Sequence, residues 1–89
     1  MTTRTTQKEL ESLVDYLNEI ANRPAKPYTD RKANVGNFHL SYAYGGVTLH
    51  EMFNDGGGVT TPLGGGYFTK RELADKLRAF IAGYHLAKE

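Results

Sequence analysis

Two alternating runs separated by Gly45 and Gly46 constrain the fold of this chain more than any other feature. Over residues 37–44 and 47–53, large apolar side chains alternate with small or polar ones, which is the period of a half-buried β-strand. Two glycines between such runs favour a tight hairpin, because these turns require positive φ angles. The pattern therefore predicts an antiparallel hairpin of two strands, at about 37–44 and 47–53.

With the two glycines as the turn, Tyr44 is expected opposite Val47. The further pairs expected on that face are Tyr42 with Leu49, Leu40 with Glu51 and Phe38 with Phe53, and this face is predicted to meet the core. The other face would carry His39, Ser41, Ala43, Thr48, His50 and Met52. Glu51 is the one carboxylate on the core face, so it must lie at the sheet edge or have a partner.

Both ends of the chain carry a helix signature. The order Thr-x-x-Glu, which is typical of a capping box, begins at Thr6 and again at Thr69. Apolar residues at helical spacing follow each box. Helices are therefore predicted at about 7–22 and 70–84.

The remaining segments are a loop and a third strand. Residues 23–36 contain two prolines and several charges, which predicts an ordered or semi-ordered loop. The third strand is expected at about 59–63, at an edge of the sheet, because Pro62 has no amide donor. Together these elements predict one α+β domain over residues 1–89. Its order is α-β-β-β-α, with a three-stranded antiparallel sheet and both helices packed on one face.

The composition sets limits on compartment and partners. The 89 residues include no cysteine, so the chain has neither a disulfide framework nor a thiolate metal site. The first residues lack the apolar segment of a signal peptide, and no apolar run approaches the roughly 20 residues that span a bilayer. We therefore expect a soluble cytoplasmic protein without a membrane partner. A net charge of +1 argues against strong non-specific attraction to nucleic acid.

The residues that could support catalysis or metal binding are few. Ser12 is expected on a helix and Ser41 on a strand, and neither has the surroundings of an activated nucleophile. His50 and Glu51 are neighbours in one strand, so they point to opposite faces and cannot form an acid–base pair. His39 and His50 share a face, but two imidazoles without a third ligand do not predict zinc. The sequence predicts no enzyme, no cofactor and no metal.

Polar surfaces are the remaining candidates for function, although charged faces of this kind often serve only solubility. The first helix would present three carboxylates at i, i+4 and i+8. The full set predicted to bind a protein partner is Glu11, Asp15, Glu19, Arg23, Lys26, Tyr28, Arg31, Lys32, His39 and His50. The set predicted for the alternative, binding of nucleic-acid phosphates, is Lys70, Arg71, Lys76 and Arg78 on the second helix, together with the basic loop at 23–32.

The element order and the basic start of the second helix resemble the double-stranded RNA-binding domain. That family is also α-β-β-β-α and has a glycine-rich turn before a basic helix start. Lys70 and Arg71 match its first two basic positions, whereas Ala74 stands at the third. The family's long loop, which carries a groove-reading histidine, is replaced by Gly45 and Gly46. The resemblance is therefore one of topology, and the departures fall on the RNA-contacting parts.

The order Leu-x-Tyr-x-Tyr-Gly-Gly-Val-x-Leu, then Gly-Gly-Gly, then Thr-Lys-Arg-Glu-Leu resembles small proteins encoded by phages and prophages. It covers roughly residues 38–83. Such proteins include inhibitors of host defence, anti-CRISPR proteins among them. The resemblance implies a non-enzymatic protein that binds and inhibits a host defence protein or nucleoprotein complex, with a CRISPR effector as the expected target. A small nucleic-acid-binding protein is the alternative, and either a monomer or a homodimer is expected.

Overall fold

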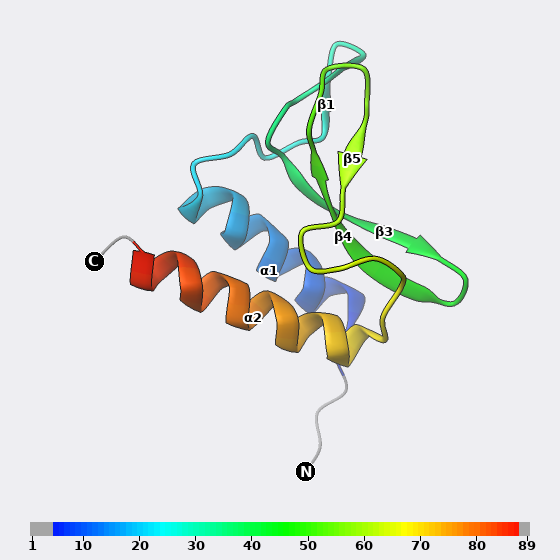
Figure 1. Ribbon diagram of the computed structural model, residues 1–89, viewed down its shortest axis with the longest axis vertical. Coiled ribbons are helices and arrows are strands. Elements are labelled where there is room, and N and C mark those ends of the chain that lie inside the picture. The colour runs from blue at the N-terminus through cyan, green and yellow to red at the C-terminus, as the bar shows by residue number, and fades with distance from the viewer. Residues whose placement is uncertain (1–4, 88–89) are drawn as a thin grey trace.

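The computed structural model describes residues 5–87, in which two helices lie side by side along one face of a three-stranded antiparallel sheet (Figure 1). The predicted α+β fold class is confirmed. The sheet has the strand order β3-β4-β5, and a separate two-stranded hairpin, β1-β2, precedes it in the chain. That hairpin and the connection between β4 and β5 project beyond the helices.

Both helices begin where the Thr-x-x-Glu sequences predict, but both hydrogen bonds of the capping box are formed only at the second helix, since the Glu9 carboxylate pairs with Arg78 instead. Helix α1 spans Gln7–Ile20, and the Thr6 hydroxyl accepts a hydrogen bond of 3.1 Å from the Glu9 amide. Helix α2 spans Lys70–Ala87, and both bonds of its box are formed between Thr69 and Glu72, at 3.0 and 3.1 Å. Helix α1 ends two residues before the predicted boundary, because Asn22 takes a left-handed φ of 56°.

The predicted register of the main hairpin is wrong by two residues. Strand β3, Phe38–Ala43, pairs with β4, Gly46–Met52, so that Tyr42 lies opposite Val47. Leu40 lies opposite Leu49 and Phe38 opposite Glu51. A shift of two residues leaves the side chains within the two strands on their predicted faces, because the side-chain period of a strand is two. Tyr44 and Phe53, also predicted on the core face, lie outside the strands and are exposed.

The turn moves because Gly46 is needed inside the strand. A Cβ atom on Gly46 would lie 2.9 Å from the Phe68 carbonyl oxygen and 3.0 Å from the Tyr67 Cβ. Only glycine allows this close approach. The positive φ angles of the turn therefore fall on Tyr44, at 53°, and Gly45, at 73°. The Tyr44 side chain is 94% exposed, so its unusual backbone conformation causes no clash in the core.

The third strand is shorter than predicted, and its edge position is confirmed. Strand β5 covers only Val59–Thr60 and pairs with β4 at the opposite side from β3. Pairing ends before Pro62, which cannot donate to a ladder. Farther along, Val47 and Phe68 form an isolated bridge that continues this side of the sheet.

Residues 23–36, predicted as a loop, contain a short hairpin. Strand β1, Tyr28–Thr29, pairs with β2, Lys32–Ala33, around a turn in which two non-glycine residues have positive φ. The Asn34 amide holds the hairpin by donating to the Lys26 carbonyl and the Thr29 hydroxyl, at 2.9 and 2.7 Å. These side-chain bonds leave no periodic signal in the sequence, which is why the sequence pattern predicted a loop.

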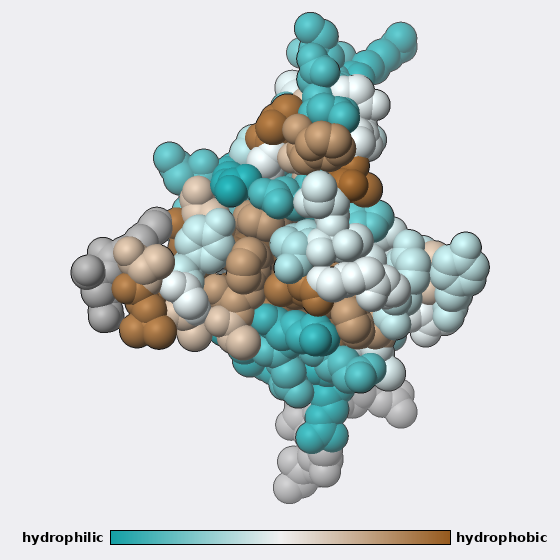
Figure 2. Space-filling view, viewed as in Figure 1, coloured by the Kyte–Doolittle hydropathy of each residue, from teal (hydrophilic) through white to brown (hydrophobic). Residues whose placement is uncertain are grey.

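Two segments make up what we call the projecting lobe, namely residues 26–35 and residues 53–59. A Cβ atom on Gly57 would lie 3.3 Å from the Tyr28 hydroxyl, so the β1-β2 hairpin reaches the connection between β4 and β5. That connection is fixed by Asn54, whose side-chain oxygen accepts hydrogen bonds from the Gly56 and Gly58 amides at 3.0 and 2.8 Å. In Figure 2 apolar residues reach the surface of the lobe beneath a hydrophilic tip.

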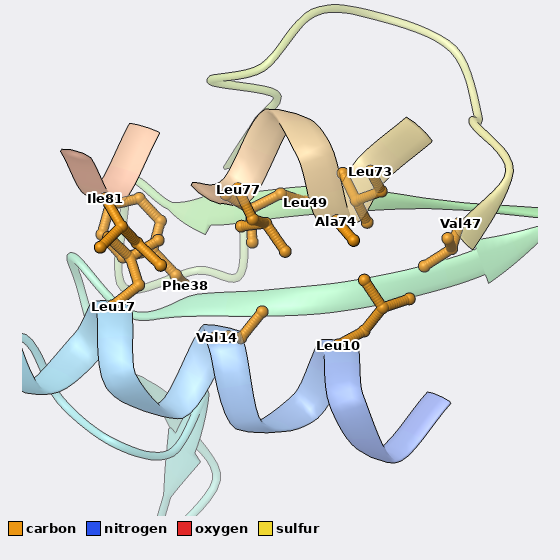
Figure 3. Packing of buried hydrophobic residues seen from close by; sticks show 10 residues of the cluster. All are labelled: Leu10, Val14, Leu17, Phe38, Val47, Leu49, Leu73, Ala74, Leu77 and Ile81. Carbon is orange, nitrogen blue, oxygen red and sulfur yellow. The ribbon is translucent and has the colours of Figure 1, made fainter. Parts of the chain in front are cut away.

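The core lies between the helices and the inner face of the sheet (Figure 3). Its buried members are Leu10, Val14, Leu17, Phe38, Val47, Leu49, Leu73, Ala74, Leu77 and Ile81. Phe38, Val47 and Leu49 share one face of the β3–β4 pair and meet both helices, which confirms the predicted core face. Helix α1 contributes residues at i, i+4 and i+7, as its apolar stripe predicts.

Candidate partner-binding site

The projecting lobe exposes four large apolar side chains. Tyr28, Val35, Phe53 and Val59 are between 38% and 58% exposed. At the base of the lobe, Ala33 and Met52 are almost fully buried, outside the main core cluster. The lobe therefore combines a buried base with an apolar surface that faces solvent.

Cationic residues lie beside this apolar surface. Lys26, Arg31 and Lys32 are exposed on the β1-β2 hairpin or directly before it. With Tyr28, the structure brings together four of the ten residues predicted to bind a partner. Sequence reasoning missed Val35, Phe53 and Val59. It placed Phe53 in the core, whereas β4 ends at Met52 and the Phe53 side chain is 58% exposed.

Arg23, also predicted to bind a partner, is engaged within the chain. Its Nη1 atom donates to the Gly36 carbonyl and to Glu51 Oε2, both at 3.0 Å. Its guanidinium also lies 5.2 Å from the centre of the Phe38 ring. The expected partner of Glu51 is thereby identified. Arg23 fastens the segment after α1 to the sheet, which leaves it fewer donors for another molecule.

His39 and His50 lie directly opposite each other on the outer face of the sheet. Their ring centres are 5.6 Å apart in an edge-to-face arrangement, and His39 Nδ1 is 3.1 Å from Asn37 Oδ1. Partial burial lowers the pKa of both imidazoles, and the charge of His50 lowers the pKa of His39 further. Both imidazoles therefore carry less positive charge at pH 7 than free imidazoles do. Within residues 5–87, no three His, Asp or Glu side chains lie close enough together to hold a metal ion.

The outer face offers less accessible surface than the strand alternation predicts. Thr48 and Met52 were expected to face solvent there, and each is only 1% exposed. His39 and His50 are half-buried. The two histidines are thus the centre of a small, partly covered surface rather than of an open sheet face.

The acidic residues of α1 divide between a groove and open solvent. Glu11 and Asp15 line an open groove of about 250 Å³ between α1 and β3, whereas Glu19 lies outside it. Tyr42 also lines the groove. Partial burial and the negative charge of Glu11 raise the pKa of the Tyr42 hydroxyl. Two of the three predicted carboxylates therefore line the same groove.

Two of the four basic residues predicted on α2 already interact with other side chains of the protein. Arg78 forms ion pairs with Glu9 and Asp75, and the Lys76 ammonium lies 5.0 Å from the centre of the Phe68 ring. Lys70 and Arg71 are exposed.

The start of α2 already holds an anionic group of the chain itself. The Glu72 carboxylate accepts a hydrogen bond from the Thr69 amide. This hydrogen bond from the Thr69 backbone, together with a hydrogen bond to the Thr69 side chain, lowers the pKa of Glu72. An external phosphate would have to compete with this carboxylate for the helix N-terminus.

The surfaces differ in how far their side chains are already engaged. Several charged groups of α2 and Arg23 have partners within the chain, whereas the apolar side chains of the projecting lobe face solvent. None of the helices within residues 5–87 has both the length and the apolar character needed to cross a membrane. Comparisons with protein-family models, with curated proteins and with solved structures found no match to this chain.

Proposed function

We propose that this protein is a non-enzymatic, phage-type binding protein that occupies a surface of a host defence protein or nucleoprotein complex and inhibits it. A CRISPR effector is the first candidate target. The projecting lobe is the observation that carries this proposal, because it presents Tyr28, Val35, Phe53 and Val59 to solvent. Contiguous exposed apolar residues bordered by polar ones commonly mark protein interaction sites.

The lobe has the composition of an interface centre. Aromatic side chains such as Tyr28 and Phe53 are enriched among residues that dominate binding energy, and a surrounding polar rim excludes water. Lys26, Arg31 and Lys32 would form that rim. Their charge suits an acidic protein surface or the phosphates of a nucleoprotein complex.

The lobe is also held in place before binding. Asn34 fixes the β1-β2 hairpin, and Asn54 fixes the turn between β4 and β5. A surface that is already ordered loses less conformational entropy when it meets a partner. This favours recognition by a preformed surface over folding on binding.

A phage-challenge assay tests the proposal. The chain would be expressed in a panel of bacterial hosts, each carrying one type of CRISPR immunity against a plaque-forming phage, and plaquing efficiency would be measured. We expect plaquing to rise in at least one host and to fall back when Tyr28→Ser and Phe53→Ser are combined. Leu86→Ser is the matched control, because Leu86 is 72% exposed on α2, outside the lobe.

Thermal unfolding of each variant would establish that loss of inhibition is not loss of the fold. No rise in any host would refute the CRISPR target. A rise that the double lobe variant leaves unchanged would refute the assignment of the binding surface.

A further inference from the structure

The outer edge of β3 carries backbone groups that no strand within residues 5–87 pairs. Val47 exchanges two hydrogen bonds with Phe68, of 2.9 and 2.8 Å, so its N–H and C=O point away from β3. Residues opposite each other in an antiparallel pair alternate between bonded and non-bonded rows. Tyr42, opposite Val47, and Leu40, opposite Leu49, therefore direct their N–H and C=O groups away from β4. Within residues 5–87, β3 is the end strand of its sheet.

At Phe38, the outward backbone groups of this edge are already hydrogen-bonded within the protein. The buried Asn18 side chain donates to the Phe38 carbonyl and accepts from the Phe38 amide, both at 2.9 Å. This is the pair of bonds that a neighbouring strand would make. The next outward groups, on Leu40 and Tyr42, follow at steps of about 7 Å along the strand.

The groove beside this edge has acidic walls. Glu11 and Asp15 line it, and among residues 5–87 no lysine or arginine does. His39 is also in the lining, and burial lowers its pKa, so it adds less positive charge at pH 7 than a free imidazole would. The volume of about 250 Å³ lies below the usual range for small-molecule sites, and it suits a few side chains of a peptide.

We infer that the free edge of β3 binds an extended, lysine- or arginine-bearing segment of a partner protein, which adds to the sheet as a further strand. Side chains alternate along such a strand, so every second one faces α1. Cations at these positions reach Glu11 and Asp15. The surface is separate from the projecting lobe, so this inference does not rest on the proposed function.

Charge argues against a second copy of this chain as the occupant. Pairing of two β3 edges about a two-fold axis would bring the Glu11 and Asp15 carboxylates of both copies to the same junction. Like charges on facing elements repel, and charged residues beside an edge strand commonly prevent such pairing. A basic segment from another protein has the opposite charge and meets no such repulsion.

Amide hydrogen exchange followed by NMR tests the inference on the full chain. The probe is a capped seven-residue peptide in which lysine alternates with valine. In the free protein, we expect the Leu40 and Tyr42 amides to exchange much faster than those of Ser41 and Ala43. Addition of the probe should protect Leu40 and Tyr42. A peptide with glutamate in place of lysine, and a lysine peptide with methylated backbone nitrogens, should give no protection.

Charge variants locate the site. Combining Glu11→Gln with Asp15→Asn should weaken probe binding roughly 3- to 10-fold, as expected for two partly exposed ion pairs. Glu19→Gln, on the same helix but outside the groove, should leave it unchanged. Absence of protection by the lysine probe, or equal protection by the glutamate peptide, would overturn the inference. Protection that grows with protein concentration alone would overturn it in favour of a second copy.

Discussion

Asn18 is the side chain whose removal tests the packing of α1 against the sheet most sharply. It is 2% exposed and makes two hydrogen bonds of 2.9 Å to the backbone of Phe38, which is itself 2% exposed. Asn18→Ala removes both bonds and leaves the Phe38 N–H and C=O without partners. It keeps the helix intact, because alanine is the best helix former.

The magnitude follows from the two orphaned groups. Each buried backbone group left unsatisfied costs about 1–3 kcal/mol, and alanine regains about 0.5 kcal/mol of helix propensity over asparagine. Water that enters from the adjoining groove reduces the cost by bonding one of the groups. We therefore expect the free energy of unfolding to fall by about 2–4 kcal/mol, which lowers Tm by about 10–25 °C for a domain of this size.

Urea unfolding followed by circular dichroism measures this loss. Ser12→Ala is the control, because Ser12 is exposed on the same helix and its removal should change stability by less than about 0.5 kcal/mol. The m-value should stay the same in both variants. If Asn18→Ala lowered the free energy of unfolding no more than the control does, the stabilising role of the Asn18 hydrogen bonds to Phe38 would be refuted.

Three further outcomes follow from local geometry. Gly46→Ala should destabilise the fold by about 1–3 kcal/mol because its Cβ meets a neighbouring backbone carbonyl at 2.9 Å, whereas Gly65→Ala, with nothing within 4 Å, should be nearly neutral in the same urea titration. Burial lowers the folded-state pKa of His39 and His50, so near and below pH 6.5 the unfolded chain binds more protons than the folded chain. The free energy of unfolding should therefore be highest above pH 6.5 and fall as the pH drops toward the folded-state pKa values. Unfolding midpoints at pH 7.5 and 5.5 should show this decline in the native chain, and a smaller decline when both histidines are replaced by asparagine. Thr69→Ala should lower Tm through loss of the α2 cap, at a cost of about 1 kcal/mol.

The sequence predicted the elements that depend on local, periodic signals. The boxes at Thr6 and Thr69 mark the helix starts, and the apolar stripes identify the buried helix faces. Strand alternation assigned the core face correctly, because it survives a two-residue shift of register. The partner expected for Glu51 was found in Arg23.

The features that sequence reasoning missed depend on particular contacts and element ends that leave no periodic signal in the sequence. Gly46 reads as a turn residue, yet it lies in β4 because the Tyr67–Phe68 segment approaches it closely. The short β1-β2 hairpin is held by amide bonds from Asn34, which have no sequence period. The exposed position of Phe53 follows from where β4 ends, so an alternation pattern alone assigns it to the core.

The candidate site was predicted only in part, for the same reason. Tyr28 and the nearby cations could be identified from an unusual proline- and charge-rich segment. Val35 and Val59 carry no signal of exposure in their own surroundings, since isolated valines are usual in cores. Their place on one lobe comes from the meeting of residues 26–35 with residues 53–59, which are far apart in the chain.

Affinity capture from a host lysate, with and without nuclease, tests the proposed function most directly. The native chain would be compared with the Tyr28→Ser and Phe53→Ser double variant, and retained proteins would be identified by mass spectrometry. We predict one stoichiometric protein partner that survives nuclease treatment and is lost from the double variant. Retention that disappears with nuclease would instead direct attention to phosphate binding by Lys70 and Arg71, and equal retention by the double variant would contradict the role of the lobe.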